Sequence, residues 1–275
     1  MNGLFDNHNH SNFSFDGSMT SVYASAATAA EKGLGGLCFS DHCDFSLPAD
    51  KRQDGPTVPE VFDVKSQQEE IDRVQALIPQ IKILKGIEVG MEKSTRDQIR
   101  QHLDTHKFDQ IIASVHYLDD TDPWYGSYYI GKEWKQAYGH YLETIFEEMT
   151  WLKDFDIMGH LDYVVRYAPY PVTSLRYRDF GDIIDEMFKF LIYEGKALEI
   201  NTKSYQDYSG RLVSLDADLL LRYREMGGEI ISLGSDSHEC SRVGESFNEY
   251  AARLKALGFR WTAHYEKRNL VQVPL

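Results

Sequence analysis

The stretch Gly3-Leu4-Phe5-Asp6-Asn7-His8-Asn9-His10 shows a pattern that recurs along the chain, a short apolar run followed by histidines and acids. The apolar run predicts a buried strand. His8 and His10 are two residues apart on an extended segment, so both rings point to the same side and can bind one metal ion. The same order of strand and polar cluster recurs through the rest of the 275 residues.

Six further apolar runs predict strands, at 36–39, 81–84, 110–113, 155–158, 197–200 and 229–233, and a weaker run lies near Val271. Apolar residues recur every three or four positions in segments between them, as in amphipathic helices that begin near Trp134, Phe180 and Phe247. Strands that alternate with helices predict an α/β fold with a mostly parallel sheet. Seven such units indicate a barrel, complete or distorted, and we expect a single domain over residues 1–275.

Candidate metal ligands follow these strands. They are His8, His10, Asp16, His42, Glu88, His116, His160, Asp236 and His238. The carboxyl ends of parallel barrel strands share one face, so we expect one site there. Imidazole and carboxylate ligands together are typical of zinc, manganese or iron. Nine ligands exceed the needs of one tetrahedral ion, so we expect two or three ions, with Glu88 as the bridge because a carboxylate has two oxygens. Such a cluster favours a phosphate ester as substrate, because cations stabilise anionic oxygens.

Composition restricts the partners. The chain has 29 basic and 43 acidic residues and a formal net charge of −14, which repels nucleic acid. We find no run of about 18 apolar residues that could span a bilayer. The opening residues lack the basic and then apolar pattern of a signal peptide. We therefore expect a cytoplasmic protein that binds neither nucleic acid nor membrane, and the oligomeric state stays open.

At these residues the sequence resembles the polymerase and histidinol phosphatase (PHP) family of metal-dependent phosphoesterases. The motifs that carry the resemblance are His8-x-His10-Ser11, Ser40-Asp41-His42, Gly86-Ile87-Glu88, Ser114-Val115-His116, Gly159-His160-x-Asp162 and Ser235-Asp236-x-His238. Two further stretches, Glu199-Ile200-Asn201-Thr202 and Val243-Gly244-Glu245-Ser246-Phe247, are similar to the histidinol-phosphate phosphatase branch of that family.

The resemblance implies a distorted (β/α)7 TIM-like barrel with metals at the carboxyl ends of the strands. It places the first ion on His8, His10, Glu88 and Asp236, the second on Glu88, His116 and His160, and the third on Asp16, His42 and His238. It also implies hydrolysis of L-histidinol phosphate by a metal-bridging hydroxide. Asp16, His42 and His238 would then be catalytic, because they would assist the departure of the alkoxide.

Substrate contacts are less clearly marked in the sequence. Arg166 is a candidate for phosphate, and Asp162 a candidate for the amine of the substrate or, like Asp41, for orienting an imidazole. The branch usually has an arginine shortly after Asn201-Thr202, and this chain has Lys203 and Arg211 as possible replacements. We also expect the aromatic loop 121–125 to wall the pocket, and the segment Ser46 to Pro59 to form a long loop or lid.

Four other activities compete with this interpretation. A nucleic-acid phosphodiesterase needs a basic track, which we do not find in the sequence. Amidohydrolase-type deaminases and lactonases usually bridge their metals with lysine or lack the closing Asp-x-His. A non-catalytic metal-binding module is disfavoured because nine ligands make an open cluster. A phosphotyrosine-protein phosphatase, or a phosphatase for another small phosphomonoester, stays open.

Overall fold

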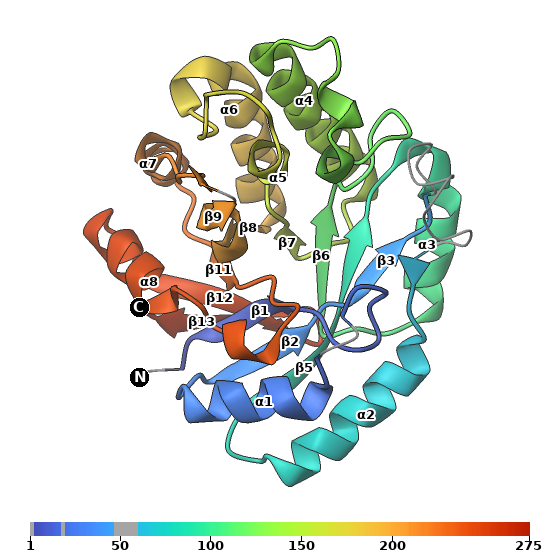
Figure 1. The fold of residues 1–275 in the computed structure, drawn as a ribbon. Helices are drawn as coiled ribbons and strands as arrows, with labels where there is room; N and C mark the ends of the chain where they lie inside the picture. Colours follow the sequence, from blue (N-terminus) through green and yellow to red (C-terminus); the bar gives the residue numbers. More distant parts are fainter. Residues whose placement is uncertain (1–2, 18–19, 47–59, 209) are drawn as a thin grey trace.

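Seven parallel strands form the centre of the fold, and the helices lie around them (Figure 1). The computed structural model describes residues 3–17, 20–46, 60–208 and 210–275. In spatial order the strands are β1 (Phe5–Asn9), β2 (Gly36–Phe39), β5 (Lys82–Gly90), β6 (Gln110–Ser114), β7 (Ile157–Met158), β8 (Ala197–Asn201) and β11 (Ile231–Gly234). Each pairs in parallel with the next.

The sheet curls until its two edges almost meet. Beyond the end of β11, the backbone N–H of Asp236 donates to the carbonyl of His8 at 2.8 Å, and His10 donates to the carbonyl of Ser237 at 2.9 Å. A parallel bridge between Asn9 and Ser237 lies at the same place. This nearly closed barrel of seven strands confirms the predicted fold class, and its distortion is the incomplete pairing of β1 with β11.

The longer helices cover the outside of the barrel. They are α1 (Val22–Glu31), α2 (Val64–Leu77), α3 (Arg96–Thr105), α4 (Trp134–Leu152), α6 (Tyr177–Glu194), α7 (Ala217–Glu225) and α8 (Phe247–Ala256). The short α5 (Tyr163–Arg166) lies instead at the carboxyl ends of the strands. The three helices predicted from periodicity are confirmed as α4, α6 and α8. The Ser21 side chain accepts a hydrogen bond from Ala24 N and so caps α1. Val22, Ala26 and Ala29 form the buried face of that helix, which packs on the barrel.

Two of the strands continue further than the apolar runs that predicted them. The first was predicted to end at Phe5 but runs to Asn9, and the third continues through Glu88 to Gly90. Every residue of β1 is buried. His8 and Glu88 are therefore interior positions of strands and do not follow them. Hydrophobicity does not mark these strand ends, because polar side chains fill the interior there.

Several short strands were not predicted. β3 (His42–Asp44) runs parallel to β5 and places His42 beside Glu88, and β4 (Glu60–Val61) pairs antiparallel with β3. β9 (Asp207–Tyr208) and β10 (Arg211–Leu212) form a small hairpin. β12 (Trp261–Glu266) and β13 (Asn269–Pro274) form a longer one, of which the weak run near Val271 indicated only the second strand.

The hairpin β12–β13 packs against the beginning of the barrel. His264 on β12 stacks on Phe5, with ring centroids 3.6 Å apart, and the Asn7 side chain donates to the Ala263 carbonyl at 2.9 Å. Both contacts involve β1 before the histidine cluster. The hairpin therefore covers the strand starts and leaves the carboxyl ends to the site described below.

No helix among the described ranges is both long and apolar enough to cross a membrane. The predicted loop from Ser46 to Pro59 lies outside the described residues, apart from Ser46 itself.

Candidate metal centre

Glu88 lies at the centre of the histidine cluster. Its Oε2 atom is 3.2 Å from His8 Nε2 and 3.5 Å from His10 Nε2. The same oxygen is 3.0 Å from His42 Nδ1, because β3 pairs with β5 at this level. One carboxylate oxygen thus faces three imidazoles from two separate segments, β1 with the residue that follows it and β3.

The other oxygen of Glu88 faces a second pair of imidazoles. Its Oε1 atom lies 2.9 Å from His160 Nε2 and 3.2 Å from His116 Nε2. Those two ring nitrogens are 3.4 Å apart. Ser114 also donates to Oε1 at 2.7 Å. The two oxygens of Glu88 therefore divide five histidines into two groups, which is the arrangement that a bridging carboxylate requires.

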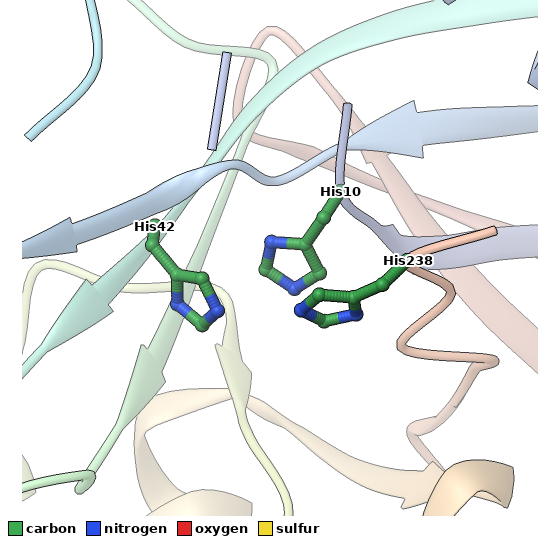
Figure 2. A group of neighbouring side chains, drawn as sticks. All are labelled: His10, His42 and His238. Carbon is green, nitrogen blue, oxygen red and sulfur yellow. The ribbon is translucent and has the colours of Figure 1, made fainter. Parts of the chain in front are cut away.

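A third group lies nearer the surface. The rings of His10, His42 and His238 come together in Figure 2, with centroids 4.1 Å apart for His10 and His42 and 4.2 Å apart for His10 and His238. Asp16 Oδ2 is 2.9 Å from His238 Nε2 and 3.7 Å from His42 Nε2. Asp236 joins the cluster through Oδ1, 3.5 Å from His10 Nε2. All nine predicted ligands thus converge.

The donor atoms in this cluster fit divalent metal ions. Nε2 of His8, Nε2 of His10 and Oε2 of Glu88 are buried and have no hydrogen-bond partner among the described residues. With metal–ligand bonds of about 2.1 Å, neighbouring ligand atoms around one ion lie about 3.0–3.4 Å apart. The 3.0–3.5 Å separations around Glu88 Oε2 match that spacing. Burying such atoms without partners is costly, and a cation would satisfy them together.

Opposite charges shift the pKa values within the cluster. Burial raises the pKa of Glu88, but the imidazoles of His8 and His116 outweigh it and hold the pKa well below the ordinary value. Burial likewise raises the pKa of Asp16, and the nearby His42 and His238 lower it further than burial raises it. Both carboxylates are therefore ionised near neutral pH and available to cations.

Two carboxylates that were not predicted as site residues contact histidines of the cluster through the ring nitrogen that does not face Glu88. Glu199 Oε1 lies 2.7 Å from His8 Nδ1, and Asp44 Oδ1 lies 3.0 Å from His116 Nδ1. Such contacts orient a ligating imidazole and fix its tautomer. The available signal was a charged residue within an apolar strand, as in Ala197–Asn201 around Glu199.

Asp41 was predicted to orient an imidazole, and the structure shows an indirect route. Its Oδ1 atom accepts a hydrogen bond from Ser14 Oγ at 2.9 Å. Ser14 Oγ lies 3.1 Å from Nδ1 of His10. Asp41 also accepts from the backbone N–H of Ser11 at 2.6 Å. It therefore fixes the turn after β1 and reaches His10 through Ser14.

A cavity of about 400 Å³ opens beside the cluster. Six predicted ligands line it: Asp16, His42, His116, His160, Asp236 and His238. Asp122, Trp124 and Tyr125 also line it, which confirms that the aromatic loop 121–125 walls the pocket. The Trp124 side chain is 58% exposed, although it packs edge-on against Tyr167.

Arg166 and Lys203, two of the predicted substrate contacts, also line the cavity. Arg166 is 1% exposed, and it donates to Asp236 Oδ2 and Ser204 Oγ at 2.9 and 2.8 Å. Lys203 Nζ is 3.1 Å from Asp236 Oδ1 and 3.0 Å from His238 Nδ1. Both cationic side chains thus reach the edge of the ligand cluster.

The other two predicted contacts are placed differently. Arg211 donates to the backbone carbonyls of Tyr170, Val165 and Val172, and it is not among the described residues that line the cavity. Asp162 is also absent from that lining and accepts from Ser204 Oγ at 2.8 Å, the hydroxyl that binds Arg166. Arg211 therefore supports a loop, and Asp162 supports Arg166 from behind.

Comparisons with known proteins agree with this geometry. Residues 6–203 match the family model of the PHP domain. The chain therefore belongs to the PHP domain family.

Within that family the similar proteins include one of defined activity. The histidinol-phosphatase of Lactococcus lactis subsp. lactis (strain IL1403) is 33% identical over 262 residues, which cover 94% of this chain and 93% of that protein. A crystal structure of histidinol phosphate phosphatase from the same organism contains zinc, L-histidinol and phosphate. It superposes with a TM-score of 0.85 and 31% identity, and the match covers 98% of both chains.

Proposed function

We propose that this protein is a metal-dependent phosphomonoesterase that hydrolyses L-histidinol phosphate to L-histidinol and phosphate. The observation that carries the proposal is the position of Glu88, whose two oxygens lie 2.9–3.5 Å from ring nitrogens of five histidines beside a cavity. The similarity to the lactococcal histidinol-phosphatase over nearly the whole chain supports this choice of substrate.

The proposed ligand sets are those that the resemblance to the PHP family implies, and the convergence of their side chains supports them. His8, His10, Glu88 and Asp236 would hold one ion, Glu88, His116 and His160 a second, and Asp16, His42 and His238 a third. Candidate metals are zinc, manganese and iron, because the ligands are imidazoles and carboxylates. When bound, such cations neutralise phosphoryl oxygens and lower the pKa of coordinated water.

Two cationic side chains are proposed to bind the phosphate. Arg166 and Lys203 line the cavity and contact Asp236 from two directions. A guanidinium and an ammonium at the edge of a metal cluster suit a dianionic phosphate group. Because Arg166 is buried and bonded to Ser204, it is preorganised and loses little entropy when the substrate binds.

The organic part of the substrate is proposed to contact the aromatic rim. Trp124 and Phe15 line the cavity and are 58% and 53% exposed. Large aromatic side chains kept in solvent at a pocket mouth can stack on a planar ring such as an imidazole. Asp16, His42 and His238 lie where this rim meets the ligand cluster. We assign these three residues to assisting the departure of the alkoxide.

The proposal extends to the surroundings of the enzyme. Residues 1–275 form one domain, the protein acts in the cytoplasm, and it binds neither nucleic acid nor membrane. The formal net charge of −14 supports a small phosphomonoester over a polyanionic substrate.

A phosphate-release assay across substrates tests the proposal. Protein loaded separately with zinc, manganese or iron would be given histidinol phosphate, nucleoside monophosphates and a phosphotyrosine peptide. We expect kcat/KM for histidinol phosphate to exceed the others by more than tenfold and to vanish with a chelator. A smaller preference would refute the substrate while retaining the phosphatase, and chelator-resistant turnover would refute the metal requirement.

A further inference from the structure

Glu199 is buried in the barrel, and the ligand sets proposed above do not include it. It stands on β8, and its two oxygens contact residues of different segments. Oε1 lies 2.7 Å from Nδ1 of His8, and Oε2 accepts a hydrogen bond from the backbone N–H of His160 at 2.6 Å. One carboxylate thus ties together two histidines that are assigned to different ions.

The two ring nitrogens of His8 have different surroundings. Nε2 faces Glu88 and has no hydrogen-bond partner among the residues that the structure describes, whereas Nδ1 faces Glu199. A neutral imidazole that offers a lone pair at one nitrogen carries its proton on the other. Glu199 can accept the hydrogen bond from Nδ1–H, which selects the tautomer in which Nε2 is free to bind a metal.

Gly234 provides the space that the Glu199 carboxylate occupies. A Cβ atom at position 234 would lie 2.2 Å from Glu199 Oε1 and 2.6 Å from the Cβ of His8. Gly234 is the last residue of β11 and pairs with Asn201, two residues after Glu199 on β8. Any larger residue would push the carboxylate away from His8, so glycine is required here for space.

The same arrangement occurs on the other side of the cluster. Asp44 Oδ1 lies 3.0 Å from Nδ1 of His116, and a Cβ atom on Gly90 would lie 1.7 Å from that oxygen. Each of these carboxylates therefore sits behind a predicted ligand, in a space left open by a glycine at the end of a strand. This repetition indicates that both carboxylates serve the ligands in front of them.

We propose that Glu199 is a positioning residue that raises the affinity of the cluster for metal. It does so by fixing the tautomer of His8 and the backbone of His160. This inference rests on the proposed function, because it assumes that the cluster binds metal. A change at Glu199 should lower the affinity for metal, and it should lower turnover only through the loss of bound metal.

Glu199→Gln is the informative variant because its size is nearly unchanged. All three partners of Glu199 are donors, the ring N–H of His8, the backbone N–H of His160 and the side-chain amide of Asn201, and glutamine has only one acceptor oxygen. The amide nitrogen must then face a donor on one side. We expect zinc affinity, measured by competition with a chromogenic chelator, to fall roughly 10- to 100-fold. Saturating zinc should restore kcat, because the ligands themselves are unchanged.

Gly234→Ala crowds both the Glu199 carboxylate and the Cβ of His8, so it should weaken zinc binding at least as much as Glu199→Gln. Gly139→Ala is the control, since a Cβ atom there on α4 meets nothing closer than 3.6 Å, and zinc affinity should stay within twofold. The melting temperature of each metal-free protein verifies that it folds.

Zinc binding by Glu199→Gln and Gly234→Ala within twofold of the parent would overturn the inference. The inference would also be overturned if Glu199→Gln kept the zinc affinity of the parent but had a lower kcat that saturating zinc does not restore. That result would assign Glu199 to the reaction itself. If the parent protein binds no metal, the proposed function fails instead, which separates the two results.

Discussion

Nε2 of His8 and Oε2 of Glu88 lie 3.2 Å apart near the carboxyl ends of β1 and β5, and both atoms are buried. Neither has a hydrogen-bond partner within residues 3–17, 20–46, 60–208 and 210–275. Burying two polar atoms without hydrogen-bond partners costs free energy unless a further group lies between them and binds both. A divalent cation is the group that fits both, because it accepts a lone pair from each.

Glu88→Ala should remove both metals that Glu88 is proposed to bridge. We expect kcat/KM to fall by roughly a thousandfold or more, equivalent to about 4 kcal/mol, with fewer ions bound per chain. Phosphate release and elemental analysis measure the two effects. The control is Glu143→Ala on the exposed face of α4, which should match the parent. Full activity in Glu88→Ala would contradict the bridge.

Lys203 and Arg211 should respond differently to the same substitution. Lys203→Met removes an ammonium at the cavity, and a hydrogen bond to a charged group is worth about 1.5–3 kcal/mol, so kcat/KM should fall roughly ten- to a hundredfold. Arg211→Met removes hydrogen bonds to backbone carbonyls and should lower the melting temperature, with kcat/KM within twofold. Steady-state kinetics measures the change in kcat/KM, and thermal unfolding measures the change in melting temperature. A loss of kcat/KM in Arg211→Met but not in Lys203→Met would contradict this assignment.

Trp124→Ala should affect one substrate more than another. An aromatic pair contributes about 0.5–1.5 kcal/mol, so KM for histidinol phosphate should rise roughly three- to tenfold. A phosphomonoester without a planar ring, such as glycerol phosphate, should show little change. Equal losses for both substrates would mean that Trp124 only shapes the loop.

His264 should make folding stability depend on pH. Burial lowers its pKa below the ordinary value, and Glu266 opposes this only in part. The unfolded chain therefore takes up a proton near pH 6.5 while the folded chain does not, so stability falls as pH decreases below that value. The slope is at most about 1.4 kcal/mol per pH unit for one proton.

His264→Phe keeps the stacking on Phe5 and removes this titration. Urea unfolding at pH 7.5 and 5.5, with a chelator present throughout, compares the two proteins. The parent should lose more stability between these pH values than the variant. An equal loss would show that His264 protonates as readily in the folded state as in the unfolded state.

The convergence of the nine candidate ligands could be predicted from the sequence because each belongs to a polar cluster next to an apolar run. Parallel strands bring their carboxyl ends to one face whatever the loop lengths, so Glu88 and Asp236 could be placed together without knowing the path between them. The barrel itself followed from the same alternation of strands and helices.

Residues whose role depends on the direction of the side chain could not be predicted from the sequence. Glu199 and Asp44 lie behind the ligands, and only the three-dimensional path shows that they reach His8 and His116. Lys203 and Arg211 both follow β8, and the sequence does not separate them. The turn at Thr202–Tyr205 brings Lys203 to the cavity, whereas the hairpin β9–β10 leads Arg211 to backbone carbonyls.

The most direct test of the metal centre is anomalous X-ray diffraction from crystals of the zinc-loaded protein, recorded on both sides of the zinc edge. We expect anomalous peaks on both sides of the Glu88 carboxylate, one within about 2.3 Å of Nε2 of His8 and another within about 2.3 Å of Nε2 of His160. The absence of anomalous density at Glu88 in fully loaded, active protein would contradict the account.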